Sequence, residues 1–370
     1  MKVIIAAAGT AGHINPGLSI ANKIKEEQPN SEIIFIGTTR GLENDLVPRA
    51  GYKLKTIEAY GLSLKRPDRL LKTLKGFGEA KRIIKQFKPD VVIGTGGYIC
   101  GAVITEASKL GIPTMLHESN AFAGKAVKML SKRTDCIMVG FEETKQTLSS
   151  NAKKIVVTGN PTKIKDLNLS KNEKEQKIKE LGLNENKPIL LVFGGSQGAK
   201  AINDTIIKIV KLKEDKEYQI IWAPGPAQYE LIKEELKSSN IDIEKIENIK
   251  VFPYIYNMEE IMNISDLFIC RSGAMTVNEV SIVGKPAIFV PLPGVSQNHQ
   301  EYNAKVLEKI GAAKIIHNED LEKIDLNKYI QDIIYNKDLL KQMGEKAKSV
   351  SNKNALEIIY KEIKNILHNC

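Results

Sequence analysis

Two stretches of the sequence share one pattern: a short apolar run leads into a glycine-rich turn and then into an amphipathic segment. The first extends from Val3 through "GTAGH" to Gly17, and the second is "PILLVFGGSQGA", from Pro188 to Ala199. A strand that enters a glycine turn and opens a helix is the repeating unit of parallel α/β sheets. Because this unit restarts near the middle of a 370-residue chain, the sequence predicts two α/β domains in tandem.

β-Branched runs alternate with amphipathic stretches along both halves, which is typical of doubly wound parallel sheets. Ligands of such sheets bind at the carboxyl ends of the strands, so we expect these ends in the two domains to face a shared cleft. The expected strands are Val3–Ala8, Glu32–Ile36, Val91–Gly94, Thr114–His117, Cys136–Val139, Ile155–Thr158, the run after Pro188, Tyr218–Trp222, Ile249–Phe252, Leu267–Cys270, Ala287–Val290 and Ala313–Ile316.

The alternation breaks after "GNP", Gly159 to Pro161, where a span rich in Lys, Asn and Glu follows. We therefore expect a first domain over 1–162 and a second over 163–349. The periodic tail 350–370 is expected to form a helix that packs back on the first domain.

The excess positive charge lies in the first half of the chain. Of the net +10, residues 1–165 carry 26 Lys or Arg and 14 Asp or Glu, a net of +12, whereas the remainder carries 28 and 30, a net of −2. This asymmetry predicts an anionic partner for the first domain: nucleic acid, an acidic lipid surface or a phosphorylated substrate. The sequence has no zinc spacing or recognition-helix signature, so we expect no nucleic-acid binding.

The first apolar run ends in a glycine turn, so we interpret it as a strand and not as a signal peptide. Four scattered cysteines and the absence of metal-ligand spacing fit a reducing cytoplasm and predict no metal site. The basic segment 64–89 holds nine Lys or Arg with interleaved apolar residues. It predicts contact with an anionic membrane surface, although a crossover helix with a buried apolar face fits the same pattern.

Two glycine turns in the second half are suited to phosphates. "GGSQGA" offers backbone amides, the Ser196 hydroxyl and Gln197, and a helix amino terminus follows. "CRSGAMTVNEV" repeats the device, with Thr276 in the first helical turn and Glu279 placed to accept ribose hydroxyls. Two such turns in one domain suggest a nucleoside diphosphate between them. The amide-rich "SQNHQEYNA", with Gln300 and Asn303, suits sugar hydroxyls, or is simply a polar junction between a loop and a helix.

In the first half, "AAAGTAGH" resembles a dinucleotide fingerprint in which alanine replaces the first glycine. That reading requires an acidic residue after the second strand, where "IFIGTTRG" has none, so an NAD-dependent dehydrogenase is excluded. The alternative is that this loop presents His13 to a substrate. Tyr98 in "GTGGY", and Glu118 and Asn120 in "HESNAFAG", follow later strands and are further candidates.

With these motifs in order, the chain resembles the MurG family of peptidoglycan glycosyltransferases. The resemblance spans nearly the whole chain and rests on "GTAGHINPG", "GTGGY", "HESNAFAG", "GNP", "GGSQGA", "RSGAMTVNE" and "NHQEYNA". It implies a GT-B fold and transfer of N-acetylglucosamine from UDP-N-acetylglucosamine to the 4-hydroxyl of undecaprenyl-linked lipid I, which gives lipid II. It also implies a peripheral location on the cytoplasmic face of the cell membrane and no cofactor.

The resemblance also implies roles for individual residues. On the donor side, the diphosphate would be held by Ser196 and Gln197 and by the turn of Ala274, Met275 and Thr276. Glu279 would hold the ribose and the Ile255 backbone the uracil. The sugar would be held by Gln300 and Asn303. The acceptor side would comprise Thr10, Ala11, Gly12, His13, Tyr98, Asn120 and Lys163.

This sequence departs from the family's usual pattern at Ala8, Ala11, Ser119 and Lys163, and these departures weaken specific contacts of the first loop and of Lys163 but not the resemblance. We expect an inverting displacement with His13 as general base, because an imidazole has an ordinary pKa of about 6.5. Glu118 is the second candidate, as base or as the group that orients an imidazole. A GT-B enzyme that uses a UDP-sugar with another lipid or small-molecule acceptor, and a non-catalytic UDP-sugar-binding module, are the alternatives.

Overall fold

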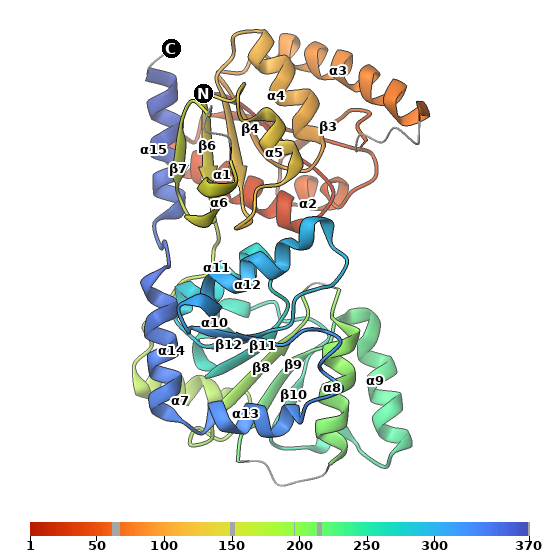
Figure 1. Ribbon diagram of the computed structural model, residues 1–370, viewed down its shortest axis with the longest axis vertical. Helices are drawn as coiled ribbons and strands as arrows, with labels where there is room; N and C mark the ends of the chain where they lie inside the picture. Colours follow the sequence, from red (N-terminus) through yellow and green to blue (C-terminus); the bar gives the residue numbers. More distant parts are fainter. Residues whose placement is uncertain (61–66, 149–151, 196, 213–216, 369–370) are drawn as a thin grey trace. The chain divides into compact units, whose positions relative to one another are not determined.

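The computed structural model describes residues 1–60, 67–148, 152–195, 197–212 and 217–368. They form two compact units, one of Met1–Lys163 with Asn352–Cys370 and one of Ile164–Ser351. Each unit has one parallel sheet with helices on both of its faces (Figure 1). This confirms the predicted α/β class with two doubly wound sheets.

The sheet of the first unit has seven strands in the order β3-β2-β1-β4-β5-β6-β7. Strand order reverses between β1 and β4, so the connections that leave these two neighbours run in opposite directions and open a crevice at their carboxyl ends. The strands are β1 (Lys2–Ala7), β2 (Glu32–Gly37), β3 (Lys53–Thr56), β4 (Val91–Gly96), β5 (Thr114–Glu118), β6 (Cys136–Val139) and β7 (Ile155–Val157).

Alternation of apolar side chains along β1 divides the core of this unit into two layers. Val3 and Ile5 pack with α1, α2 and α15, whereas Ile4 and Ala6 pack with α3, α4 and α5. The helices are α1 (Ala11–Glu27), α2 (Glu43–Arg49), α3 (Pro67–Phe87), α4 (Ile99–Lys109), α5 (Lys125–Leu130), α6 (Glu143–Thr147) and α15 (Ala355–His368).

The carboxyl-terminal helix α15 belongs to the first unit and packs beside α1 (Figure 1). Ile359 and Ile363 are buried in the same layer as the apolar face of α1. Lys23 of α1 pairs with Glu357 at 3.5 Å, and Lys154 pairs with Glu362. The unit is therefore completed by a segment that follows the whole of the second unit in the sequence.

The sheet of the second unit has six strands in the order β10-β9-β8-β11-β12-β13, and its order reverses between β8 and β11. The strands are β8 (Ile189–Phe193), β9 (Gln219–Ala223), β10 (Ile249–Val251), β11 (Leu267–Cys270), β12 (Ala287–Phe289) and β13 (Ala313–Ile315). The helices are α7 (Lys171–Glu180), α8 (Lys200–Lys211), α9 (Pro226–Ser238), α10 (Met258–Ile264), α11 (Ala274–Val283), α12 (His299–Lys309), α13 (Leu326–Ile334) and α14 (Lys337–Ser349), with short 3₁₀ turns at Ile243–Lys245 and Ser296–Asn298.

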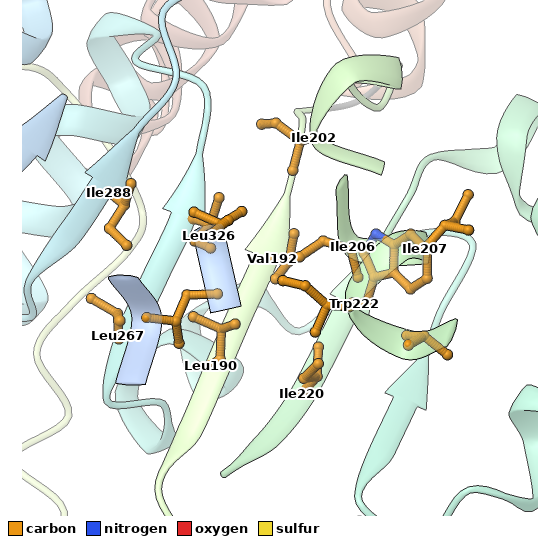
Figure 2. Packing of buried hydrophobic residues seen from close by; sticks show 14 of the residues in the cluster. Leu190, Val192, Ile202, Ile206, Ile207, Ile220, Trp222, Leu267, Ile288 and Leu326 are labelled. Carbon is orange, nitrogen blue, oxygen red and sulfur yellow. The ribbon is translucent and has the colours of Figure 1, made fainter. Parts of the chain in front are cut away.

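One layer of the second unit's core lies between the sheet and helices α8, α9 and α13. Val192 of β8 and Trp222 of β9 pack with Ile206 of α8 in this layer (Figure 2). Trp222 is fully buried. Its indole N–H therefore needs an acceptor inside the protein.

Each strand expected from the sequence is present, with bounds that differ by at most two residues. The sequence patterns did not predict β3, Lys53–Thr56, which pairs with β2 at the edge of the sheet. Its two lysines are exposed, and charged residues are common on edge strands, so it lacks the apolar signal of an inner strand.

Within the described residues, no helix has both the length and the apolar character that crossing a membrane requires.

Candidate active site

The loop after β1 is short and leads directly into α1. Gly9 has a φ of 96°, a conformation that favours glycine, and Thr10 is the N-cap residue of α1. The amides of His13 and Ile14 both donate to the Thr10 carbonyl, at 3.0 and 3.2 Å. Ala11 is already helical, and Ala8 is buried, with a relative exposure of 3%. The left-handed conformation is needed at Gly9, so the alanines at 8 and 11 leave this turn intact.

His13 lies against the loop after β4. Gly96 and Gly97 have φ values of 127° and 80°, and a Cβ at Gly96 would lie 2.1 Å from His13 Nδ1. The buried hydroxyl of Thr95 donates to the His13 carbonyl at 2.7 Å. Tyr98, the N-cap residue of α4, is 45% exposed beyond these glycines. The structure therefore brings His13 and the β4 loop together at the crevice between β1 and β4.

Glu118 is the last residue of β5 and is buried, with 5% exposure. One carboxylate oxygen accepts from the Asn120 amide at 2.9 Å and from Asn120 Nδ2 at 3.0 Å, and the other accepts from the Gly124 amide at 2.7 Å. The carboxylate thus points toward the loop that follows β5, and its hydrogen bonds fix the position of Asn120 in that loop. This geometry suits a positioning role for Glu118 better than proton abstraction.

His117, the residue before Glu118, is completely buried. Its Nε2 lies 3.2 Å from the Gly159 carbonyl, which only accepts, so Nε2 carries the proton and Nδ1 accepts from the Ser119 hydroxyl at 3.3 Å. Burial lowers the pKa of His117 to about 4, and the hydrogen bond to Gly159 opposes only part of that shift. His117 is therefore neutral at pH 7 and joins β5 to the "GNP" turn.

Sequence reasoning missed a buried carboxylate in the same unit, Glu43 at the start of α2, whose side chain has no solvent exposure. Its Oε2 accepts from the Gly9 amide at 2.9 Å, and its Oε1 accepts from the amide and the hydroxyl of Thr38, at 2.9 and 2.7 Å. Burial by itself raises the pKa of Glu43, but these hydrogen bonds outweigh it and hold the pKa below its ordinary value. No local signal marks Glu43, because its partner Gly9 lies 34 positions away.

In the second unit, the loop after β8 contains Gly195 and Gly198, with φ values of 87° and 75°, before α8 begins. The candidate Ser196 lies outside the described residues, and Gln197 is exposed. A Cβ at Gly198 would lie 1.8 Å from the Pro224 carbonyl, so the turn after β9 packs closely against this loop and leaves no room for a side chain at Gly198. Asn203 fixes that turn: its Nδ2 donates to Pro224 O at 2.9 Å, and its Oδ1 accepts from the Trp222 indole at 3.0 Å.

The loop after β11 lies beside the β8 loop, across the point where strand order reverses. Gly273 is the N-cap of α11, so Ala274, Met275 and Thr276 form the first helical turn, with Glu279 one turn further. Backbone amides in this first turn have no partner inside the helix, which makes the turn suitable for an anion. Arg271, which no sequence pattern marks as a site residue, donates to the Val290 and Pro291 carbonyls at 3.0 and 3.2 Å.

The segment that begins α12 is tied to the same turn. The Ser272 hydroxyl donates to the Gln300 carbonyl at 2.8 Å, and the buried Asn303 donates through Nδ2 to the Ser272 carbonyl at 3.2 Å. The Gln300 side-chain oxygen accepts from the Leu292 amide at 3.0 Å. The structure thus brings Gln300 and Asn303 to the α11 turn, and these bonds brace the loop.

Two predicted residues lie apart from these loops. Ile255 is buried after the edge strand β10, between Tyr254 and Tyr256, whose rings meet edge to face with centroids 4.9 Å apart. Lys163 is exposed and is the last residue of the first unit before Ile164.

No cluster of three or more His, Cys, Asp or Glu side chains with metal-binding geometry occurs among the residues that the structure describes.

The chain matches two family models: the glycosyltransferase family 28 N-terminal domain over residues 3–139 and the C-terminal domain over residues 189–359. It is 44% identical over 370 residues to the UDP-N-acetylglucosamine–N-acetylmuramyl-(pentapeptide) pyrophosphoryl-undecaprenol N-acetylglucosamine transferase of Thermoanaerobacter sp. (strain X514), covering 99% of this chain and 100% of that protein. The transferase of the same name from Acetivibrio thermocellus is also 44% identical, over 100% and 99% of the two chains.

Among solved structures, the crystal structure of Acinetobacter baumannii MurG superimposes with a TM-score of 0.78 at 30% identity, covering 98% of this chain and 99% of that one. The two doubly wound sheets therefore have the GT-B architecture that the sequence predicts. The chain belongs to the MurG family of glycosyltransferases, within glycosyltransferase family 28.

Proposed function

We propose that this chain transfers N-acetylglucosamine from UDP-N-acetylglucosamine to lipid I, the undecaprenyl-pyrophosphoryl N-acetylmuramoyl pentapeptide, and so forms lipid II for peptidoglycan synthesis. The observation that carries the proposal is the 44% identity to a transferase named for this reaction over almost the entire length of both chains. The glycine loops at the two points of strand-order reversal support it, since such points are where ligands of doubly wound sheets bind.

The proposal assigns the donor to the second unit. The first turn of α11, with Ala274, Met275 and Thr276, and the loop that contains Ser196 and Gln197 receive the diphosphate. The Glu279 carboxylate accepts hydrogen bonds from the ribose hydroxyls, and the Ile255 backbone forms hydrogen bonds with uracil. Gln300 faces the sugar, and the buried Asn303 supports this position by holding the Ser272 carbonyl. Helix amino termini favour negative charge, so they stabilise the diphosphate as it departs and its charge grows.

The acceptor is assigned to the first unit, at Thr10, Ala11, Gly12, Tyr98 and Asn120, and at Lys163, the last residue before the second unit begins. We propose a single displacement that inverts the anomeric configuration. The 4-hydroxyl oxygen of the muramoyl sugar bonds to the anomeric carbon, the bond from that carbon to the UDP oxygen breaks, and the hydroxyl proton passes to the His13 imidazole. General bases contribute about 10²–10⁴-fold to such steps. Glu118 supports the reaction by positioning Asn120.

We further propose that the first unit binds the cytoplasmic face of an anionic membrane through α3 and α5. Leu74 and Met129 are 59% and 66% exposed, and both helices cover the same face of the sheet. Exposed basic residues accompany them on or after these helices, namely Lys75, Lys81, Arg82, Lys85, Lys125, Lys132 and Arg133. Phe77, Ile83, Ile84 and Phe87, by contrast, pack inward. Part of the predicted segment 64–89, residues 64–66, lies outside the described residues.

The experiment that tests the enzymatic proposal measures UDP release by the purified chain with UDP-N-acetylglucosamine and a lipid I analogue, in EDTA and in magnesium. We expect release that depends on the acceptor in both buffers. A matched reaction with diacylglycerol tests the alternative acceptor class. Release only with diacylglycerol, or none with either acceptor, would contradict the proposal.

A further inference from the structure

Glu43 lies at a place where two loops of the first unit meet. Its carboxylate connects the Gly9 amide of the loop after β1 with the Thr38 amide and hydroxyl of the loop after β2. The Gly9 carbonyl is held as well, because it accepts from the Leu42 amide at 3.2 Å. Both polar groups of the Gly9 residue are thus fixed by the segment that opens α2.

The space around this carboxylate is closely fitted. A Cβ at Gly41 would lie 2.0 Å from Glu43 Oε2, and a Cβ at Gly37 would lie 2.7 Å from Glu43 Cγ. Glycines at 37 and 41 therefore allow the side chain to reach Gly9. A buried carboxylate that accepts three hydrogen bonds holds its donors more tightly than a neutral acceptor does.

The position of the Gly9 peptide determines where the proposed acceptor residues that follow it in the chain lie. Gly9 precedes the N-cap Thr10, the Thr10 carbonyl accepts from the His13 amide, and His13 packs on Gly96. A shift of the Gly9 peptide would therefore move the N-cap and first turn of α1, where the proposed general base lies.

We propose that Glu43 is a positioning residue for the acceptor half of the reaction: its buried carboxylate holds the Gly9 peptide so that the first turn of α1 presents Thr10, Gly12 and His13 to the lipid-linked acceptor. This inference rests on the proposed function. Glu43 does not itself contact the substrate in this account, and the donor half of the reaction does not depend on it.

Glu43→Gln tests the proposal with little change in shape. A carboxamide can accept from Thr38, but it then turns its NH₂ toward the Gly9 amide, so a donor faces a donor. We expect kcat/KM for the lipid I analogue to fall by about tenfold or more, the range for loss of a charge-assisted hydrogen bond. The Kd for UDP should stay unchanged. Thr38→Val removes one donor to the same carboxylate and should act in the same direction, and Thr38→Ser should restore activity.

Asp135→Asn is the matched control. Asp135 accepts from the amide and hydroxyl of Thr114, both at 2.9 Å, in the same unit, but it lies at the amino ends of β5 and β6. It should lower thermal stability without changing acceptor kinetics. If Glu43→Gln and Thr38→Val change stability alone, as Asp135→Asn does, the inference is wrong.

Hydrogen exchange separates this inference from the proposed function. In Glu43→Gln the amides of residues 9–13 should exchange faster than in the unsubstituted chain, whereas in Asp135→Asn they should not. An unsubstituted chain that lacks activity with lipid I contradicts the proposed function, whatever the exchange shows. An active chain in which Glu43→Gln leaves both exchange and acceptor kinetics unchanged overturns the role of Glu43.

Discussion

The hydroxyl of Thr95 donates a 2.7 Å hydrogen bond to the main-chain carbonyl of His13. Thr95 lies near the end of β4 and His13 in the first turn of α1, so this bond joins β4 to the helix that follows β1, the neighbour of β4 across the reversal of strand order. The imidazole on the same residue lies against Gly96. The backbone and the ring of His13 are therefore both fixed by the carboxyl end of β4.

Thr95→Val should lower the free energy of unfolding by about 1 kcal/mol, the usual net contribution of one hydrogen bond, and should also lower turnover because the first turn of α1 loosens. Thr134→Val is the control, since its buried hydroxyl donates to Leu130 at 2.9 Å away from these loops. Denaturant titration and initial rates measure the two effects. Equal stability losses with equal turnover in both variants would show that the Thr95 bond has no part in catalysis.

His13→Ala should reduce turnover about 10²–10⁴-fold, because it removes the proposed general base. The Kd for UDP should remain unchanged, because UDP is assigned to the second unit. Asn15→Ala, an exposed position two residues along α1, should leave turnover as it is. Near-full turnover in His13→Ala would exclude His13 as the base.

Acidification should destabilise the chain through His117. Its pKa is about 4 in the folded protein and near 6.5 when unfolded, so the unfolded state binds more protons between these values. The stabilisation by neutral His117 is complete above pH 6.5 and is lost as the pH falls through about 4, a change of up to about 3 kcal/mol. Urea titrations of His117→Gln between pH 7 and 4 should show a shallower acid dependence than the unsubstituted chain.

The control for that experiment is His368→Gln, at an exposed histidine of α15. It should keep the acid dependence of the unsubstituted chain. If His117→Gln also keeps it, the buried imidazole does not titrate as described.

Asn203→Leu should weaken UDP binding several-fold and lower the free energy of unfolding by about 2–4 kcal/mol, because the buried Trp222 N–H and the Pro224 carbonyl each lose their partner. Gln219→Leu provides the comparison: it breaks bonds to Asn184 and Lys187 at the other end of β9. Calorimetry should find UDP affinity reduced only in Asn203→Leu. An unchanged affinity would mean that the β9 turn does not position the glycine loop after β8.

Met129→Ser and Leu74→Ser should reduce sedimentation with vesicles that contain anionic phospholipid, since each removes an exposed apolar side chain beside basic residues. Binding should also fall as salt rises, and neutral vesicles should bind less. Leu231→Ser changes an equally exposed leucine, with 64% exposure, in the second unit and should have no effect. Equal vesicle binding by all three variants would rule out α3 and α5 as the membrane surface.

The sheet architecture and the position of the glycine loops could be predicted because both arise from local patterns. Runs such as Val91–Gly94 carry their own strand signal, and a glycine turn after a strand marks the functional edge of a doubly wound sheet. The edge strand Lys53–Thr56 had no such signal, because two exposed lysines interrupt it. Its conformation depends on pairing with β2.

Contacts between distant segments could not be predicted in the same way. Glu43 becomes a partner of Gly9 only once β1 and β2 lie side by side. Glu118 follows a strand and resembles a catalytic carboxylate in the sequence, yet its oxygens accept from its own loop. In the basic segment, periodicity alone does not distinguish the inward Phe77 from the exposed Leu74, because both lie on one amphipathic helix.

The most direct test of the account is to isolate the lipid product formed from UDP-N-acetylglucosamine and lipid I, and to determine its mass and the configuration of its new glycosidic bond by NMR. We expect one added N-acetylhexosamine in a β linkage to the 4-hydroxyl of the muramoyl sugar. A retained α linkage would contradict the single displacement, and a lipid of unchanged mass would contradict the transferase activity itself.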